Sequence, residues 1–249
     1  FATIRVMRKL MRHPAFRIAT FIAGLAMIVA MVWYVLKHGV DWTTVFETPP
    51  QDFVMLAGLV VVSVLLTGAL FWQVTLSFDV DPRVSMVRMI ELIAASSLLN
   101  YLPLRVGLFG RAAYLKARHK LPLHQSVQVL LIVIALSTIV AILTVLIGIM
   151  PNGMRWWGGA ASLVVCSAVT PAIARLLLRR KVTHAWAWVP LRCVELAVAA
   201  GRFWLAFSIA GGDIVYWQAL IAAAGGFLIS LTGLTPNGLG LREWAVAAL

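Results

Sequence analysis

Charged residues are scarce in this chain. Asp, Glu, Lys and Arg make up 12% of its 249 residues, whereas 62% are hydrophobic. Water-soluble domains carry about 25% charged residues, and no water-soluble core of this size could bury so much apolar surface. A soluble domain is therefore excluded, and the sequence predicts one integral membrane domain over residues 1–249.

Cysteine is almost absent. Cys166 and Cys193 both lie in apolar segments, where lone thiols act as small hydrophobic side chains. They indicate neither a disulfide framework nor a zinc site. The five histidines flank apolar runs without the spacing of metal ligands. We therefore expect no metal and no cofactor.

The motifs of soluble enzymes are also missing. The chain has no phosphate-binding loop, no dinucleotide-binding glycine fingerprint, no H-E-x-x-H and no hydrolase nucleophile elbow. No nucleophile and base can be paired, so the sequence favours a protein that is not an enzyme, although a membrane enzyme stays open. Transport without an ATP motif would use a gradient or the membrane potential.

Acidic residues are few. Nine Asp and Glu stand against 21 Lys and Arg, for a formal net charge of +12. In a soluble protein this would indicate nucleic-acid binding. In a membrane protein, cations gather in cytoplasmic loops and meet anionic headgroups. We therefore expect an anionic membrane lipid as partner, and no nucleic acid.

Several apolar runs exceed the ~20 residues that cross a bilayer. Five clear spans are predicted at 16–36, 53–76, 126–150, 156–178 and 186–210. Two further apolar segments, 85–102 and 216–235, run into breaks that contain proline and glycine. The predicted fold class is thus all-α, a polytopic transmembrane helical bundle.

The first break predicts a re-entrant hairpin over 85–120. If the N-terminus is cytoplasmic and the chain turns back at Pro103, then 16 of the 21 Lys and Arg face the cytoplasm. A full crossing would instead place the cationic stretch 105–120 outside. Backbone that is not helical within the hydrocarbon region of the membrane has to be buried in protein or line a cavity.

A second hairpin is predicted within 216–249. Pro236 follows Pro103 by 133 residues, and both begin the pattern P-x-x-x-G-L after a segment rich in small residues. Three predicted spans lie between the breaks, so the hairpins should enter from opposite sides. Such inverted repeats with broken helices are typical of secondary transporters. Two unrelated kinked helices remain the alternative.

The breaks favour the binding of an anion. A helix that starts within the membrane presents unpaired N–H groups and a partial positive charge at its N-terminus. Arg105 and Arg111 flank the first break, and guanidinium groups match phosphate. We therefore predict an anionic headgroup, with the alternative that Arg111 extends to the cytoplasmic surface. The predicted substrate-binding residues are Asn100, Arg105, Arg111, Asn237, Arg242, Glu243, Glu195 and Arg202.

Glu195 is an acid inside a predicted span. Arg192 precedes it by three residues and Arg202 follows it by seven, spacings that share one helix face. Charged residues within a membrane span are rare and indicate a functional site. The alternative is an ion pair that neutralises itself and orients the helices.

Two stretches, LPLRVGLFGRAAYLKARHKLPLHQSV and TPNGLGLREWAVAAL, resemble the signature regions of the lysylphosphatidylglycerol synthase transmembrane-domain family. The second is close to that family's P-G-G-L-G-x-R-E. In the first, Pro103, Arg105, Gly107, Arg111 and Arg118 fit. The resemblance implies a flippase-like lipid protein, as in the flippase half of bacterial multiple peptide resistance factors.

The chain departs from the family at two places. Leu108 stands where the family often has an acid, and the segment 128–137 lacks the acidic and basic pair often found there. The headgroup could therefore differ from that of the aminoacyl-lipid flippases. Their aminoacyltransferase activity belongs to a separate cytosolic domain and is not expected of this chain.

The sequence thus predicts a flippase-like protein of the bacterial inner membrane, with a cytoplasmic N-terminus, that translocates a phospholipid or a polyprenyl-phosphate-linked lipid. Three alternatives stay open: the membrane domain of a lipid-modifying enzyme, a small-solute transporter and a structural partner. A homo-oligomer stays open too, because small residues at 222–226 could pack between chains. We expect the native protein to extend beyond Phe1 and Leu249.

Overall fold

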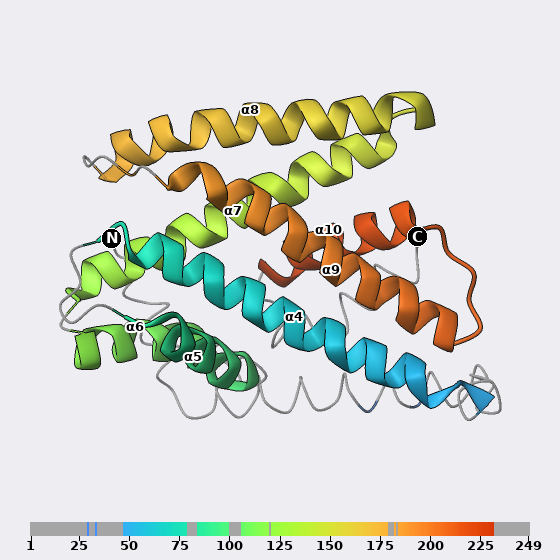
Figure 1. The fold of residues 1–249 in the computed structure, drawn as a ribbon, viewed down its shortest axis with the longest axis horizontal. Helices are drawn as coiled ribbons and strands as arrows, with labels where there is room; N and C mark the ends of the chain where they lie inside the picture. The colour runs from blue at the N-terminus through green and yellow to red at the C-terminus, as the bar shows by residue number, and fades with distance from the viewer. Residues whose placement is uncertain are drawn as a thin grey trace.

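The computed structural model describes residues 47–78, 84–99, 106–119, 121–178, 182 and 184–231, together with Val29 and Trp33. Within these residues the chain forms seven α-helices and one 3-10 helix, η2, and no strand (Figure 1). The all-α prediction is therefore confirmed for this part. The elements are α4 (Pro50–Thr75), α5 (Met86–Leu99), α6 (Val106–His119), α7 (Leu123–Ile149), α8 (Asn152–Leu178), η2 (Ala185–Ala187), α9 (Trp188–Ile209) and α10 (Tyr216–Leu231).

Three described helices are long and apolar enough to cross a membrane, as expected of an integral membrane protein. They are α4, α7 and the part of α8 from Gly153 to Arg175, with 26, 27 and 23 residues. About 20 apolar residues suffice for a crossing. α9 has 22 residues but carries three charged side chains. The predicted span 16–36 lies outside the described residues, apart from Val29 and Trp33.

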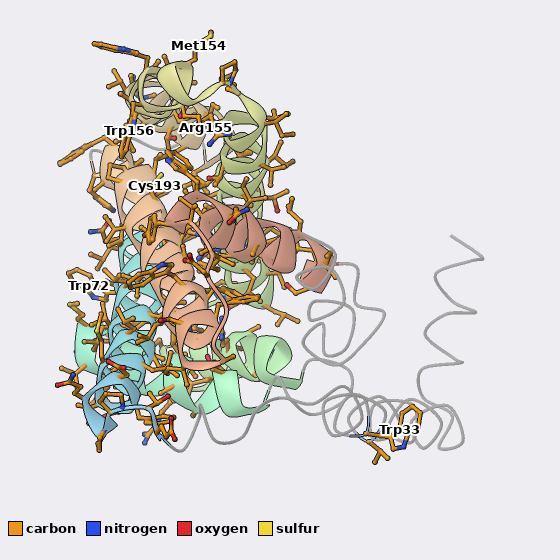
Figure 2. The ribbon with its side chains drawn as sticks, turned by 90° about the vertical axis from the view of Figure 1, so that its right-hand side faces the viewer. Trp33, Trp72, Met154, Arg155, Trp156 and Cys193 are labelled. Atoms are coloured by element: carbon orange, nitrogen blue, oxygen red, sulfur yellow. The ribbon has the colours of Figure 1, made fainter. Side chains whose placement is uncertain are left out.

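Large apolar side chains cover the outer faces of these helices. Val54 of α4, Ile149 of α7 and Val164 of α8 are 71%, 74% and 67% exposed. Trp156, near the start of α8, is 73% exposed and lies at the outer edge of the ribbon (Figure 2). Water would solvate such a surface poorly, whereas lipid tails solvate it well.

α9 is the centre of the bundle and packs against α4, α7, α8 and α10 (Figure 1). Small side chains make its contact with α10 close. Ala199 and Ala200 of α9, and Ala219 and Ala223 of α10, are all buried. Small residues let membrane helices approach closely without a hydrophobic driving force between them.

α5 and α6 are separate helices of 14 residues each that pack against each other. Arg111 Nε of α6 donates a hydrogen bond of 2.5 Å to Ser96 Oγ of α5, a residue 15 positions earlier. One continuous helix would separate these positions by about 22 Å. Each helix is about 21 Å long, too short for the ~30 Å hydrocarbon core.

This helix pair lies where the first hairpin is predicted. Its turn, with Pro103, lies outside the described residues, and re-entry into the membrane therefore stays a prediction. The second hairpin stays a prediction too: α10 covers the first part of the predicted segment, whereas residues 232–249 lie outside the described residues.

α4 and α5 meet closely at Gly68. A Cβ at this position would lie 2.7 Å from Ile90 Cγ1 and 3.1 Å from Ile90 Cα. Because the second atom belongs to the backbone, the two helices would have to move apart. We expect Gly68→Ala to lower the free energy of unfolding by about 1–3 kcal/mol, measured by denaturant unfolding in detergent micelles.

Gly58 provides a matched control on the same helix. A Cβ at this position meets nothing within 4 Å, and alanine favours a helix over glycine by about 1 kcal/mol. Gly58→Ala should therefore leave the free energy of unfolding unchanged or raise it. Equal losses in both variants would contradict the close contact between α4 and α5.

Candidate functional site

A cavity of about 270 Å³ lies between α4, α6, α7, α9 and α10. α6 belongs to the first predicted hairpin and contributes Arg111, while α10 belongs to the second and contributes Phe227 and Ser230. The cavity is thus the place where described parts of both predicted hairpins meet. The other charged side chains of the cavity belong to α9, and hydroxyl groups of α4, α7 and α10 also line it.

Among the described residues, four charged side chains line the cavity: Arg111, Arg192, Arg202 and Glu195. These three cations and one carboxylate have a summed formal charge of +2. Arg111, Arg192 and Glu195 are only 7–8% exposed. Charges interact strongly in surroundings of low dielectric constant, so this excess of positive charge favours an anion in the cavity.

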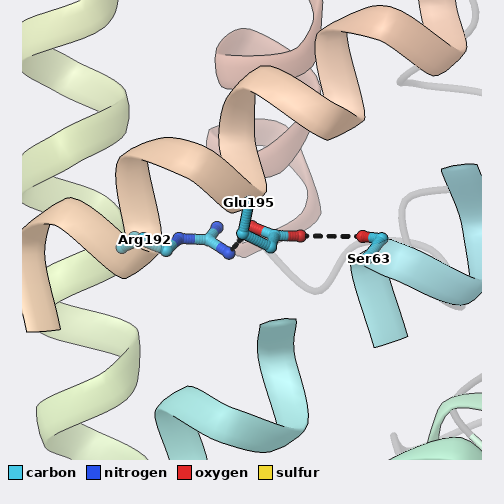
Figure 3. Close-up of polar contacts among 3 residues, drawn as sticks. All are labelled: Ser63, Arg192 and Glu195. Atoms are coloured by element: carbon cyan, nitrogen blue, oxygen red, sulfur yellow. Dashed lines mark hydrogen bonds and ion pairs between the residues drawn. The ribbon is translucent and has the colours of Figure 1, made fainter. Parts of the chain in front are cut away.

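Glu195 is held from two sides (Figure 3). Ser63 Oγ of α4 donates a hydrogen bond of 3.0 Å to its Oε1, and Arg192 Nη1 donates to its Oε2. The first bond joins residues 132 positions apart and ties α4 to α9. The ion pair uses the spacing of three residues noted in the sequence, where both side chains lie on one helix face.

The ion pair leaves donors of Arg192 available. An arginine has five N–H donors, and Arg192 Nε has no hydrogen-bond partner among the described residues. The Arg192 guanidinium also lies over the ring of Phe227, with 4.9 Å between Cζ and the ring centroid. This cation–π contact stabilises the charge without consuming an N–H donor.

Arg111 is held in a similar way. Its Cζ lies 4.9 Å from the ring centroid of Phe71 on α4, and its Nε donates to Ser96. At 7% exposure, Arg111 does not extend to an aqueous surface, so the alternative of a snorkelling side chain is wrong. Two arginines from different helices therefore present guanidinium groups to one cavity, each over an aromatic ring.

The structure brings three of the eight predicted binding residues together in this cavity: Arg111, Glu195 and Arg202. The other five, which lie outside the described residues, are Asn100, Arg105, Asn237, Arg242 and Glu243. The role of all eight in binding a substrate stays a prediction. The ion pair offered as the alternative for Glu195 does form, with Arg192.

Sequence reasoning missed three side chains of the site. Ser63, Phe71 and Phe227 carry no signal in the sequence, because their contacts with Glu195, Arg111 and Arg192 depend on how the helices are rotated against each other. Arg192 was noted only as a neighbour of Glu195. A cation inside an apolar span is itself a signal of function, and it could have added this residue.

No protein-family model, curated protein or solved structure significantly matches this chain. The described residues form a helical bundle in which three helices are long and apolar enough to span a membrane, and whose cavity is lined by charged side chains of α6 and α9. The resemblance to the lysylphosphatidylglycerol synthase transmembrane-domain family stays a prediction from its motif residues.

Proposed function

We propose that this protein binds the headgroup of an anionic lipid in the cavity and moves it between leaflets, as a flippase-like transporter. The observation that carries this proposal is that two buried arginines, Arg111 and Arg192, line one cavity in which Glu195 is the one described carboxylate. Burial of an excess charge is costly unless a counter-charge compensates it. Guanidinium groups match phosphate geometry, which favours the headgroup of a phospholipid or a polyprenyl-phosphate-linked lipid.

The size of the cavity supports a headgroup rather than a whole lipid. Its volume of about 270 Å³ is just below the ~300–1,000 Å³ of pockets that enclose drug-sized ligands. The acyl chains would remain in the bilayer, against apolar outer faces such as that of Val54 and Val61 on α4, which are 71% and 58% exposed. The headgroup would then cross through the protein while the tails stay in lipid.

The two proposed hairpins supply a route to alternating exposure. α6 and α10 line the same cavity from opposite halves of the chain, and rocking of one hairpin-bearing half against the other would open it to each side in turn. We place the protein in a bacterial cytoplasmic membrane with its N-terminus in the cytoplasm. The distribution of Lys and Arg along the sequence supports that orientation.

Leaflet exchange in proteoliposomes tests this function. Fluorescently labelled phosphatidylglycerol and phosphatidylcholine are each reconstituted with and without the protein, and the label in the outer leaflet is quenched chemically. We expect phosphatidylglycerol to exchange many times faster with protein than without it, and faster than phosphatidylcholine. Exchange at the rate of protein-free liposomes, or equal exchange of both lipids, would contradict the proposal.

A further inference from the structure

We infer that Glu195 is a proton-binding site coupled to the anion site, so that the cavity takes up an anionic headgroup together with one proton on this carboxylate. The inference rests on the proposed function. It adds a second ligand, the proton, and with it a means to drive transport with a proton gradient. Three features of the cavity carry it: competition for Arg192, the two-way hydrogen bonding of Ser63, and the lack of a second carboxyl group among the described lining residues.

The first feature is that Glu195 occupies the guanidinium that an anion would use. Arg192 Nη1 donates to Glu195 Oε2, and both side chains line the cavity. An anion that binds Arg192 therefore comes to lie beside the carboxylate. Two negative charges this close in a buried site repel each other strongly, and a neighbouring anion favours the protonated form of a carboxyl group. Anion binding and proton uptake at Glu195 thus support each other.

The second feature is that Glu195 keeps a hydrogen-bond partner in both protonation states. A hydroxyl group can donate one hydrogen bond and accept others. Ser63 Oγ, 3.0 Å from Glu195 Oε1, donates to the carboxylate and can accept from the protonated acid after rotation of its hydroxyl hydrogen. The proton on Glu195 therefore has an acceptor within reach, whereas a buried donor without one would cost about 1–3 kcal/mol.

The third feature is that Glu195 is the one carboxyl group among the described residues that line the cavity. The other described acid on the helices of the cavity, Asp52, lies in the first turn of α4 and does not line the cavity. The described polar groups that face the cavity from α4, α7 and α10 are hydroxyls, which do not titrate near neutral pH; they belong to Thr67, Ser137 and Ser230. The described cations are Arg111 on α6 and Arg192 and Arg202 on α9, and arginine stays protonated in proteins.

The remaining neighbours of α9 have their titratable groups elsewhere. Cys166 of α8 and Cys193 of α9 share a separate cavity of about 40 Å³. Next to η2, His184 Nε2 lies 3.2 Å from the backbone oxygen of Gln73, and its ring contacts Trp188. Within the described residues, Glu195 is therefore the one carboxyl group that lines the cavity.

The charge balance agrees with this coupling. The empty cavity has a formal charge of +2 from its described residues. One monovalent phosphodiester and one proton cancel each other, so the loaded cavity has the same charge as the empty one. The change between inward-facing and outward-facing states then moves the same charge across the membrane whether the cavity is loaded or empty. The direction of net transport is set by the proton and lipid gradients.

Isothermal titration calorimetry counts the protons directly. The protein in detergent is titrated with dihexanoyl phosphatidylglycerol, whose phosphodiester keeps one negative charge throughout the range. Two buffers of different ionisation enthalpy give the number of protons taken up per bound lipid. We expect close to one proton near neutral pH. The sign follows from linkage: because the complex holds more protons, affinity falls as pH rises, by up to about tenfold per pH unit.

Glu195→Gln imitates the protonated carboxyl. This variant should bind the lipid about as tightly as the unchanged protein does at low pH, take up no proton and show no pH dependence. Glu91→Gln is the matched control, because Glu91 lies exposed on α5; it should behave like the unchanged protein. Thermal unfolding of both variants verifies that they fold.

Each outcome separates the inference from the proposed function. Lipid binding without proton uptake by the unchanged protein would overturn the inference and leave the proposed function in place. So would a folded Glu195→Gln variant that loses binding, since a carboxylate would then be required. Absence of lipid binding at every pH, in the unchanged protein and in Glu195→Gln, would overturn the proposed function itself. The proton count on the unchanged protein does not depend on any variant folding.

Discussion

Replacement of Arg192 by methionine is expected to lower the free energy of unfolding by about 3–5 kcal/mol, because it leaves a buried carboxylate without its ion-pair partner. Glu195 is 8% exposed, so water cannot take over the role of the guanidinium. Methionine keeps an unbranched apolar stem that can still pack against Phe227. Denaturant unfolding in detergent micelles, followed by circular dichroism, measures the loss.

A second substitution should recover most of this loss. In Arg192→Met/Glu195→Leu both charges are gone, and replacement of a whole buried ion pair by apolar side chains is often neutral or stabilising. Arg175→Met is the matched control, since Arg175 is exposed in the last turn of α8; its effect should stay within about 0.5 kcal/mol. Equal losses in the single and double variants would show that Arg192 and Glu195 are not coupled.

Replacement of Arg111 by glutamine is expected to weaken binding of dihexanoyl phosphatidylglycerol by about 10- to 100-fold. A hydrogen bond to a charged group contributes about 1.5–3 kcal/mol, and each 1.4 kcal/mol changes affinity about tenfold. Glutamine can still reach toward Ser96 but cannot supply charge or a bidentate pair to phosphate. Calorimetric titration in detergent gives the dissociation constants.

Two further variants separate charge from packing at this position. Phe71→Leu removes the ring under the Arg111 guanidinium but keeps the cation, so it should weaken binding much less than Arg111→Gln. Arg88→Gln removes an exposed arginine from the partner helix α5 and should leave affinity unchanged. A loss of binding in Arg88→Gln as large as in Arg111→Gln would mean that net charge, rather than the cavity, governs lipid binding.

The long helices could be predicted closely. The predicted spans 53–76 and 126–150 correspond to α4 (Pro50–Thr75) and α7 (Leu123–Ile149). Length and apolar composition decide such helices, because in lipid a chain has to satisfy its own backbone hydrogen bonds. Proline marks both beginnings: Pro50 is the first residue of α4, and Pro122 is the N-cap of α7. Proline fits the first turn, where its missing N–H costs nothing.

The cavity could be predicted only in part. The spacing of Arg192, Glu195 and Arg202 on one helix is visible in the sequence, since local periodicity fixes which residues share a face. That Arg111 of α6 lines the same cavity depends on how the helices pack in the tertiary structure. α7 is apolar on every side, so its sequence does not mark which face packs against α6 and which against α10. Arrangement of the helices therefore had to come from the structure.

The most direct test of the account is a structure of the protein in nanodiscs with dihexanoyl phosphatidylglycerol. The account predicts that the phosphate of the lipid lies in the cavity, within hydrogen-bond distance of the guanidinium groups of Arg111 and Arg192. A phosphate located only at the membrane surface, with the cavity filled by an acyl chain or closed by repacked side chains, would contradict it.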